Sequence, residues 1–204
     1  MSGPKALLNA VHGRTIFARR VRVLSDALAA MIPSGPASVL DIGAGNGALA
    51  RALMDRRPEL ALSGVDVLLR PQPLIPVTSY DGHTLPFADA AFDYALLVDV
   101  LHHAEDPTAL LGEAARIARK GVLVKDHVVR RELDRQTLQV MDWVGNRGHG
   151  VALPYNYLTA AQWRVAEASA GLHRLRSSAV PGLYPPPLSW FFGRGLHFLA
   201  LLGR

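Results

Sequence analysis

Cysteine is absent from the 204 residues, which excludes disulfides and thiolate metal sites. Long hydrophobic runs are absent as well. The most apolar stretch, residues 188–202, contains Arg194 and His197 and is shorter than the ~20 apolar residues of a membrane-spanning helix. We therefore expect no stable membrane insertion. The first residues lead into no apolar signal core, so a cytoplasmic location is expected.

Acidic side chains are scarce at the start of the chain. Residues 1–35 hold five basic groups and one acid, Asp26, while the rest is nearly neutral, so the net charge of +5 lies mainly on one helix. A nucleic-acid-binding protein needs a broader basic face, and no nucleic-acid partner is predicted. The His-x-x-x-His spacing of many metal sites is also missing, and no metal site is expected.

Half of the residues are hydrophobic, which suits a single domain over residues 1–204. Strand-like apolar runs alternate with amphipathic helices, an order that predicts a doubly wound, Rossmann-like α/β sheet with helices on both faces. The predicted helices are 14–31, 48–54, 107–120 (capped by Asp106, ended by Gly121) and 159–170; the seven predicted strands are 38–40, 60–66, 75–80, 92–98, 121–125 and an antiparallel C-terminal hairpin of 172–179 with 196–202.

The most informative motif joins the first strand to its helix. Gly43, Gly45 and Gly47 alternate behind Asp41, and glycines let the backbone approach a nucleotide-like cofactor closely. Gly43-x-Gly45-x-x-Ala48 also fits a dinucleotide fingerprint, which would place a pyrophosphate at the helix N-terminus. The carboxylate of Asp41 disfavours an anion there. It suits a cationic ligand such as S-adenosylmethionine (SAM), with its ammonium and sulfonium groups.

Residues that follow the strands are the next candidates, because ligands of such sheets bind at the carboxyl ends of strands. Asp66 closes the second strand, where an acid can accept hydrogen bonds from both ribose hydroxyls of SAM or NAD. Asp81 and Gly82 follow the third strand, and Asp81 could accept from an adenine amino group. Asp99, His102 and His103 follow the fourth strand, and Lys125-Asp126-His127 ends the fifth.

At these positions the chain resembles the class I SAM-dependent methyltransferases, in particular the small-molecule group related to the ubiquinone and menaquinone biosynthesis enzymes. The helix before the first strand is typical of these enzymes, whereas a dehydrogenase domain often starts at that strand. The matching motifs, in the family's order and spacing over about residues 38–127, are Asp41-x-Gly43-x-Gly45-x-Gly47, Asp66, Asp81-Gly82-x-x-Leu85-Pro86-Phe87, Phe92-Asp93, and Leu101-His102-His103 with Asp106-Pro107.

The resemblance implies SAM as the cofactor and assigns residues to each part of it. Ala44 departs from the many members that have cysteine there, and a small residue keeps the shape of the loop. The implied contacts are Asp41, Gly43, Ala44, Gly45, Asn46 and Gly47 with the methionine part, Asp66 with the ribose, Asp81 and Gly82 with the adenine, and Val98 and Asp99 on the methionyl side; Val67 is a further cofactor contact.

Methyl transfer from a sulfonium requires chiefly that the acceptor be held in line and water excluded. A base is needed only where the acceptor must lose a proton. His102, His103 and His127 are the candidate catalytic residues by their strand-end positions. Adjacent side chains point in different directions, so we expect at most one of His102 and His103 to face the pocket; the alternative is a structural role.

The acceptor is expected to contact residues 128–158. Trp143, Asn146, Tyr155, Asn156 and Tyr157 combine aromatic rings with amide and hydroxyl groups, which suits an organic substrate of medium size. The alternative is a structured cap in which Trp143 and the tyrosines belong to the core.

The chain therefore divides into an N-terminal helical cap (1–37), a SAM-binding core (38–127), a substrate-cap insertion (128–158) and a C-terminal helix and hairpin (159–204). The sequence predicts a SAM-dependent methyltransferase that acts on a small organic acceptor. An NAD-linked oxidoreductase and a non-catalytic SAM-binding protein are the alternatives.

Overall fold

A seven-stranded sheet forms the centre of the molecule, in the order β3-β2-β1-β4-β5-β7-β6. The structure, a computed structural model, describes residues 4–146, 153–193 and 195–204. The parallel strands are β1 (Ala37–Ile42), β2 (Leu60–Asp66), β3 (Val77–Ser79), β4 (Phe92–Val98) and β5 (Ala118–His127); β7 (His197–Gly203) pairs antiparallel with both β5 and β6 (His173–Ala179). The predicted fold, including its antiparallel C-terminal strands, is confirmed.

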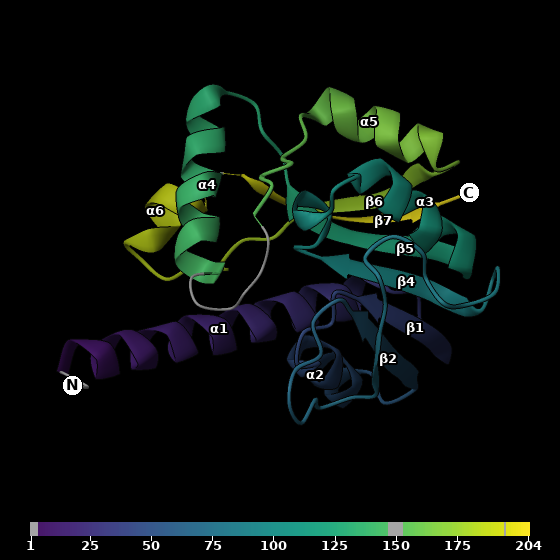
Figure 1. Cartoon of the computed structure of the whole chain (residues 1–204), viewed down its shortest axis with the longest axis horizontal. Coiled ribbons are helices and arrows are strands. Elements are labelled where there is room, and N and C mark those ends of the chain that lie inside the picture. The colour runs from purple at the N-terminus through teal and green to yellow at the C-terminus, as the bar shows by residue number, and fades with distance from the viewer. Residues whose placement is uncertain (1–3, 147–152, 194) are drawn as a thin grey trace.

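Helices cover both faces of this sheet, because successive strand residues point to opposite sides. In β4, Tyr94 and Leu96 join the core under α1 (Pro4–Met31) and α2 (Ala48–Arg56). Ala95 and Leu97 join the core under α3 (Pro107–Ile117) and α5 (Ala160–Ser169). Figure 1 shows the two pairs of helices on opposite sides of the sheet.

A cap stands beyond the carboxyl ends of the parallel strands. It consists of α4 (Glu132–Asn146), α6 (Leu188–Phe192) and the N-terminal half of α1, which extends past the sheet beneath the other two helices (Figure 1). Leu138 of α4 is fully buried in the same hydrophobic cluster as Leu24 and Leu28 of α1. The cap and the sheet therefore share one core.

One predicted boundary was wrong for a physical reason. The helix that begins after Asp106 ends at Ile117, because Ala118 already pairs with Phe92 as the first residue of β5. Gly121 consequently lies in a strand and does not end the helix. A Cβ there would be 2.5 Å from the carbonyl oxygen of Leu202, so glycine permits the close approach of β5 to β7.

Three further boundaries differ from the prediction. α1 begins at Pro4 and not near residue 14, β3 is shorter than 75–80, and α6 occupies part of the apolar C-terminal stretch. The predicted caps are confirmed: Asp106 accepts from the amides of Thr108 and Ala109, and Thr159 forms a capping box with Gln162. Within the described residues, no helix is both long and apolar enough to cross a membrane.

Candidate active site

The Gly43–Gly47 loop needs glycine for two reasons: all three of its glycines have a positive φ, and two of them leave no room for a Cβ. Gly43 and Gly47 have φ values of +76° and +75°, and a Cβ would lie 2.5 Å from Val100 at the first and 2.6 Å from Ile75 at the second. Gly45 also has a positive φ, but a Cβ there would meet nothing within 4 Å. The loop is thus packed on its inner side and leaves open space beside Gly45, where a ligand can approach the backbone.

Asp41, at the end of β1, is a buried carboxylate that has no cationic partner in the part of the chain that the structure describes. Its side chain is 3% exposed, and no donor among the described residues hydrogen-bonds to it. Loss of water, and then repulsion by the Asp66 carboxylate, raise the pKa of Asp41 to about 7. A cation placed beside Asp41 would relieve both effects.

Asp66 closes β2 and faces the loop. Its Oδ2 accepts from the amide of Gly45 at 2.8 Å and its Oδ1 from the amide of Leu68 at 2.9 Å. Carboxylate oxygens have further lone pairs, so these bonds fix the orientation of Asp66 and leave it able to accept from a ribose.

The remaining predicted cofactor residues flank this loop. Asn46 accepts from the amide of Ala48 through its side chain at 3.1 Å. Val67 is 59% exposed and packs near Gly82, whose Cβ would be 3.2 Å from it. Asp81 accepts from the amides of His83 and Thr84, both at 2.8 Å, which orders the turn after β3.

These residues fit SAM. Asp41 offers an unpaired buried anion to the ammonium group, the open face of Gly45 admits the methionine part, and Asp66 lies next to both. A pyrophosphate would add negative charge beside two carboxylates, which disfavours NAD.

Asp99 follows β4 and lies between two cations. Arg20 of α1 donates to its Oδ2 at 2.6 Å, and the buried ammonium of Lys125 contacts its Oδ1. Burial alone would raise the pKa of Asp99, but the charges of Lys125 and Arg20 outweigh it and hold that pKa below its usual range. Asp99 and Val98 therefore lie at the predicted strand end, and Asp99 also ties α1 to the sheet.

His102 lies between two carboxylates. Its Nδ1 is 2.7 Å from Oδ1 of Asp126, and its Nε2 is 3.3 Å from Oδ2 of Asp142 on α4. Burial opposes a charge on the ring, but Asp126 and then Asp142 raise the pKa of His102 to about 10. The hydroxyl of Tyr157 donates to the same oxygen of Asp142, so this carboxylate connects the cap to the turn after β4.

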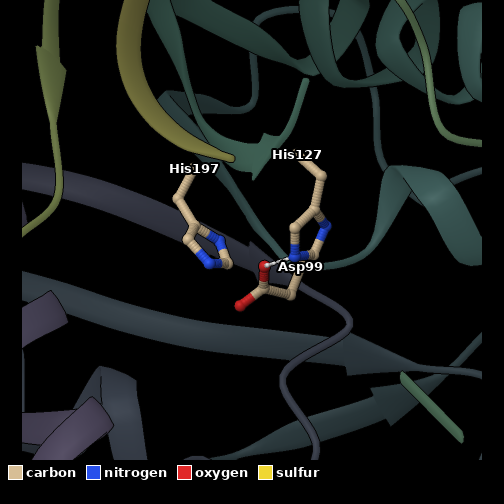
Figure 2. Close-up of side chains that lie close together, drawn as sticks. All are labelled: Asp99, His127 and His197. Carbon is tan, nitrogen blue, oxygen red and sulfur yellow. Dashed lines mark ion pairs between the residues drawn. The ribbon is translucent and has the colours of Figure 1, made fainter. Parts of the chain in front are cut away.

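His127, at the end of β5, is 2% exposed. Burial lowers the pKa of its ring. Figure 2 shows its ring facing Asp99, with His197 of β7 on the other side. The Nε2 of His127 is 3.8 Å from Oδ1 of Asp99. Lys125 lies 3.2 Å from Nδ1 of His197 and also contacts Asp99, so an ammonium already joins these two groups.

The structure separates the predicted acceptor residues. Trp143 is 51% exposed on α4, next to the buried Asp142. Asn156 holds the segment 153–158 in place, because its amide donates to the carbonyl of His102 and its side chain to the carbonyl of Ala104. Tyr155 is half-buried and Tyr157 is buried beside His102. The side chain of Asn146 lies outside the described residues.

Sequence patterns did not indicate four residues of this cluster: Arg20, Asp142, Tyr184 and His197. Arg20 contacts Tyr184 as well as Asp99, although the two contacts span 164 and 79 residues of sequence. Of these four, only His197 had a local feature that could have indicated it, because it is a lone polar residue in an apolar strand.

Comparisons with known proteins indicate the family of the chain. The profile of a family described as a methyltransferase domain matches residues 16–175. The bifunctional methionine biosynthesis protein MetXA/MetW of Rhodopirellula baltica is 35% identical in an alignment of 127 positions that covers 55% of this chain and 20% of that protein. The chain thus spans a fifth of the length of this curated relative.

Solved structures share the fold. The complex of the Haloferax volcanii Trm112 methyltransferase activator with a methyltransferase gives a TM-score of 0.71 at 20% identity, covering 94% of this chain and 92% of the other. Mitomycin 7-O-methyltransferase MmcR gives 0.64 at 21% identity, covering 98% of this chain and 58% of the other. With a family match over most of its length and a loop whose residues fit SAM, the chain belongs to the methyltransferase-domain family.

Proposed function

We propose that this protein is a SAM-dependent methyltransferase that acts on a small organic acceptor, bound between the Gly43–Gly47 loop and the cap. When bound, SAM supplies an electrophilic methyl group, so the protein chiefly has to position the acceptor and exclude water. The observation that carries the proposal is the closure of the cap over the carboxyl ends of β4 and β5. The partly buried contact of Arg20 with Asp99 and the buried contact of Tyr157 with Asp142 hold it there. A macromolecular acceptor would have to displace these contacts.

Of the three histidines predicted to be catalytic, we propose that His103 contacts the acceptor. His102 and His127 are 3% and 2% exposed, whereas His103 is partly exposed on the turn after β4. Its ring centroid lies 4.1 Å from that of His102, so the two rings are in contact. The name of mitomycin 7-O-methyltransferase describes a small organic acceptor for that protein, which is consistent with the proposal at the level of the fold.

Incubation of the full chain with SAM carrying an isotopically labelled methyl group tests the proposal. Supplied with a cell extract separated into small molecules, proteins and nucleic acids, the enzyme should transfer label to the small-molecule fraction and form S-adenosylhomocysteine. His103→Ala should raise KM for the acceptor, while His173→Ala, an exposed position on β6, should behave as wild type. Label in a macromolecular fraction would refute a small acceptor. Binding of S-adenosylhomocysteine without any turnover would support the non-catalytic alternative.

A further inference from the structure

Three potential metal ligands converge where the turn after β4 meets the end of β5. The Nδ1 of His102 lies 2.7 Å from Oδ1 of Asp126 and 3.3 Å from Nδ1 of His127, and the latter is 3.1 Å from the same oxygen. All three side chains are at most 3% exposed. A point about 1 Å above the plane of these atoms is about 2.0–2.1 Å from each, the length of Zn²⁺ bonds to imidazole and carboxylate.

The two nitrogens of each ring differ in their partners: the Nδ1 atoms lie close to Asp126, whereas the Nε2 atoms do not. Its Oδ1 is within hydrogen-bond distance of three nitrogens: the two Nδ1 atoms and the amide of His127, at 2.7 Å. The Nε2 atoms of His102 and His127 are buried and, within the part of the chain that the structure describes, form no hydrogen bond. A cation between the Nδ1 atoms would use both of their lone pairs and leave the protons on Nε2.

A carboxylate also lies near the Nε2 atom of each ring, the nitrogen that is not directed at Asp126. Oδ2 of Asp142 is 3.3 Å from Nε2 of His102, and Oδ1 of Asp99 is 3.8 Å from Nε2 of His127, as Figure 2 shows for the second pair. Histidines that bind a metal through one nitrogen usually turn the other toward a carboxylate, carbonyl or water. The arrangement at both rings matches this pattern.

The neighbouring set of Asp99, His127 and His197 is less suited to bind a metal ion. Although its ligand atoms also lie within 4.8 Å of one another, Lys125 contacts Asp99 and lies 3.2 Å from His197. A cation at that position would meet the ammonium group. Among the described residues, no hydrogen bond or ion pair joins Lys125 to His102, Asp126 or His127, and its charge acts on His127 and Asp126 only from a distance.

We propose that His102, Asp126 and His127 bind a divalent transition-metal ion such as Zn²⁺ through two Nδ1 atoms and one carboxylate oxygen. Two imidazoles and a carboxylate are a ligand set that such ions favour. The sequence alone argued against a metal held by these histidines and Asp126, because the ligands come from η1 (Leu101–His103) and β5 without a local spacing motif. The proposal is independent of the identity of the methyl acceptor.

Metal binding is tested with the full chain, freed of metal by a chelator and titrated with Zn²⁺ alone. We expect one equivalent to bind and to raise Tm, since an ion that binds only the folded state stabilises it. Co²⁺ in its place should give the visible absorption of a low-symmetry nitrogen and oxygen site. His127→Asn should weaken binding at least 100-fold, and Asp142→Asn, at the outer carboxylate, by 10–100-fold.

His173→Asn, an exposed histidine on β6, is the matched control and should bind as wild type. Equal binding by the wild type and His127→Asn would overturn the proposal, as would a wild-type protein that binds no Zn²⁺. If the wild type binds no Zn²⁺, NMR should instead find His102 as an imidazolium ion with a proton on each ring nitrogen at neutral pH. The wild-type Co²⁺ spectrum decides the matter even if the variants fail to fold.

Discussion

At the scale of single residues, the carboxylate of Asp41 is the clearest link between fold and function. Its pKa of about 7 lies above the ordinary value of 3.8 because it is buried and faces Asp66. Since the folded-state pKa is raised, folding favours the protonated form. The resulting contribution to stability is complete below about pH 4 and is lost as the pH rises through about 7. The ligand-free enzyme thus carries an unfavourable charge at Asp41 above that pH.

A bound ammonium group should remove this penalty, so cofactor binding and deprotonation of Asp41 are coupled. At pH 6, binding of S-adenosylhomocysteine should release nearly one proton from Asp41, and its affinity should rise as the pH approaches 7. Calorimetry in buffers with different ionisation enthalpies measures the released protons. Asp41→Asn should bind at least 10-fold more weakly without proton release, and Glu105→Gln, at an exposed carboxylate, should match the wild type. Proton release by Asp41→Asn equal to that of the wild type would contradict this assignment.

At the scale of elements, two glycines allow a test of how closely β5 and β7 approach. A Cβ at Gly121 would be 2.5 Å from the backbone oxygen of Leu202, whereas one at Gly112 in α3 would meet nothing within 4 Å. Gly121→Ala should therefore lower the free energy of unfolding by about 1–3 kcal/mol, the range for overpacked sites. Gly112→Ala should raise it by about 0.5–1 kcal/mol, because alanine favours a helix interior. Urea denaturation measures both; equal effects would show that β7 adjusts freely.

The same scale explains which elements the sequence could predict. Apolar runs gave the parallel strands, and Asp106 and Thr159 marked the helix starts, because these signals act within a few residues. The end of α3 was missed because β5 begins directly after Ile117, as pairing with Phe92 requires. Tertiary pairing overrode the local stop signal of Gly121.

At the scale of the whole molecule, the glycine loop after β1 was predictable and the polar cluster was not. Gly43 to Gly47 and Asp66 are recognisable because strand, turn and acid follow in a fixed order. The contact of Asp142 with Tyr157 depends on how the cap docks, and so does that of Arg20 with Asp99 across 79 residues. No local periodicity encodes such docking, so these contacts emerge only from the assembled structure.

Arg20 provides a test of that docking. Its guanidinium bridges Asp99 after β4 and Tyr184 in the segment before α6, and so joins α1, the sheet and the C-terminal part of the cap. Its side chain is 23% exposed and Lys125 also neutralises Asp99, so we expect Arg20→Met to cost only about 1–2 kcal/mol, below the 3–5 kcal/mol of a fully buried pair. That loss is smaller than a typical global stability and should act locally, through a looser cap.

Hydrogen exchange of α1 and residues 180–193 should therefore accelerate in Arg20→Met, and S-adenosylhomocysteine should dissociate several-fold faster, while exchange in β1 and β4 stays unchanged. Arg22→Met removes the same charge from an exposed position of α1 and controls for the change in net charge. If the two variants exchanged and released ligand alike, the ion pair of Arg20 would not hold the cap. If only Arg20→Met differed, a contact between residues far apart in sequence would control access to the cofactor site.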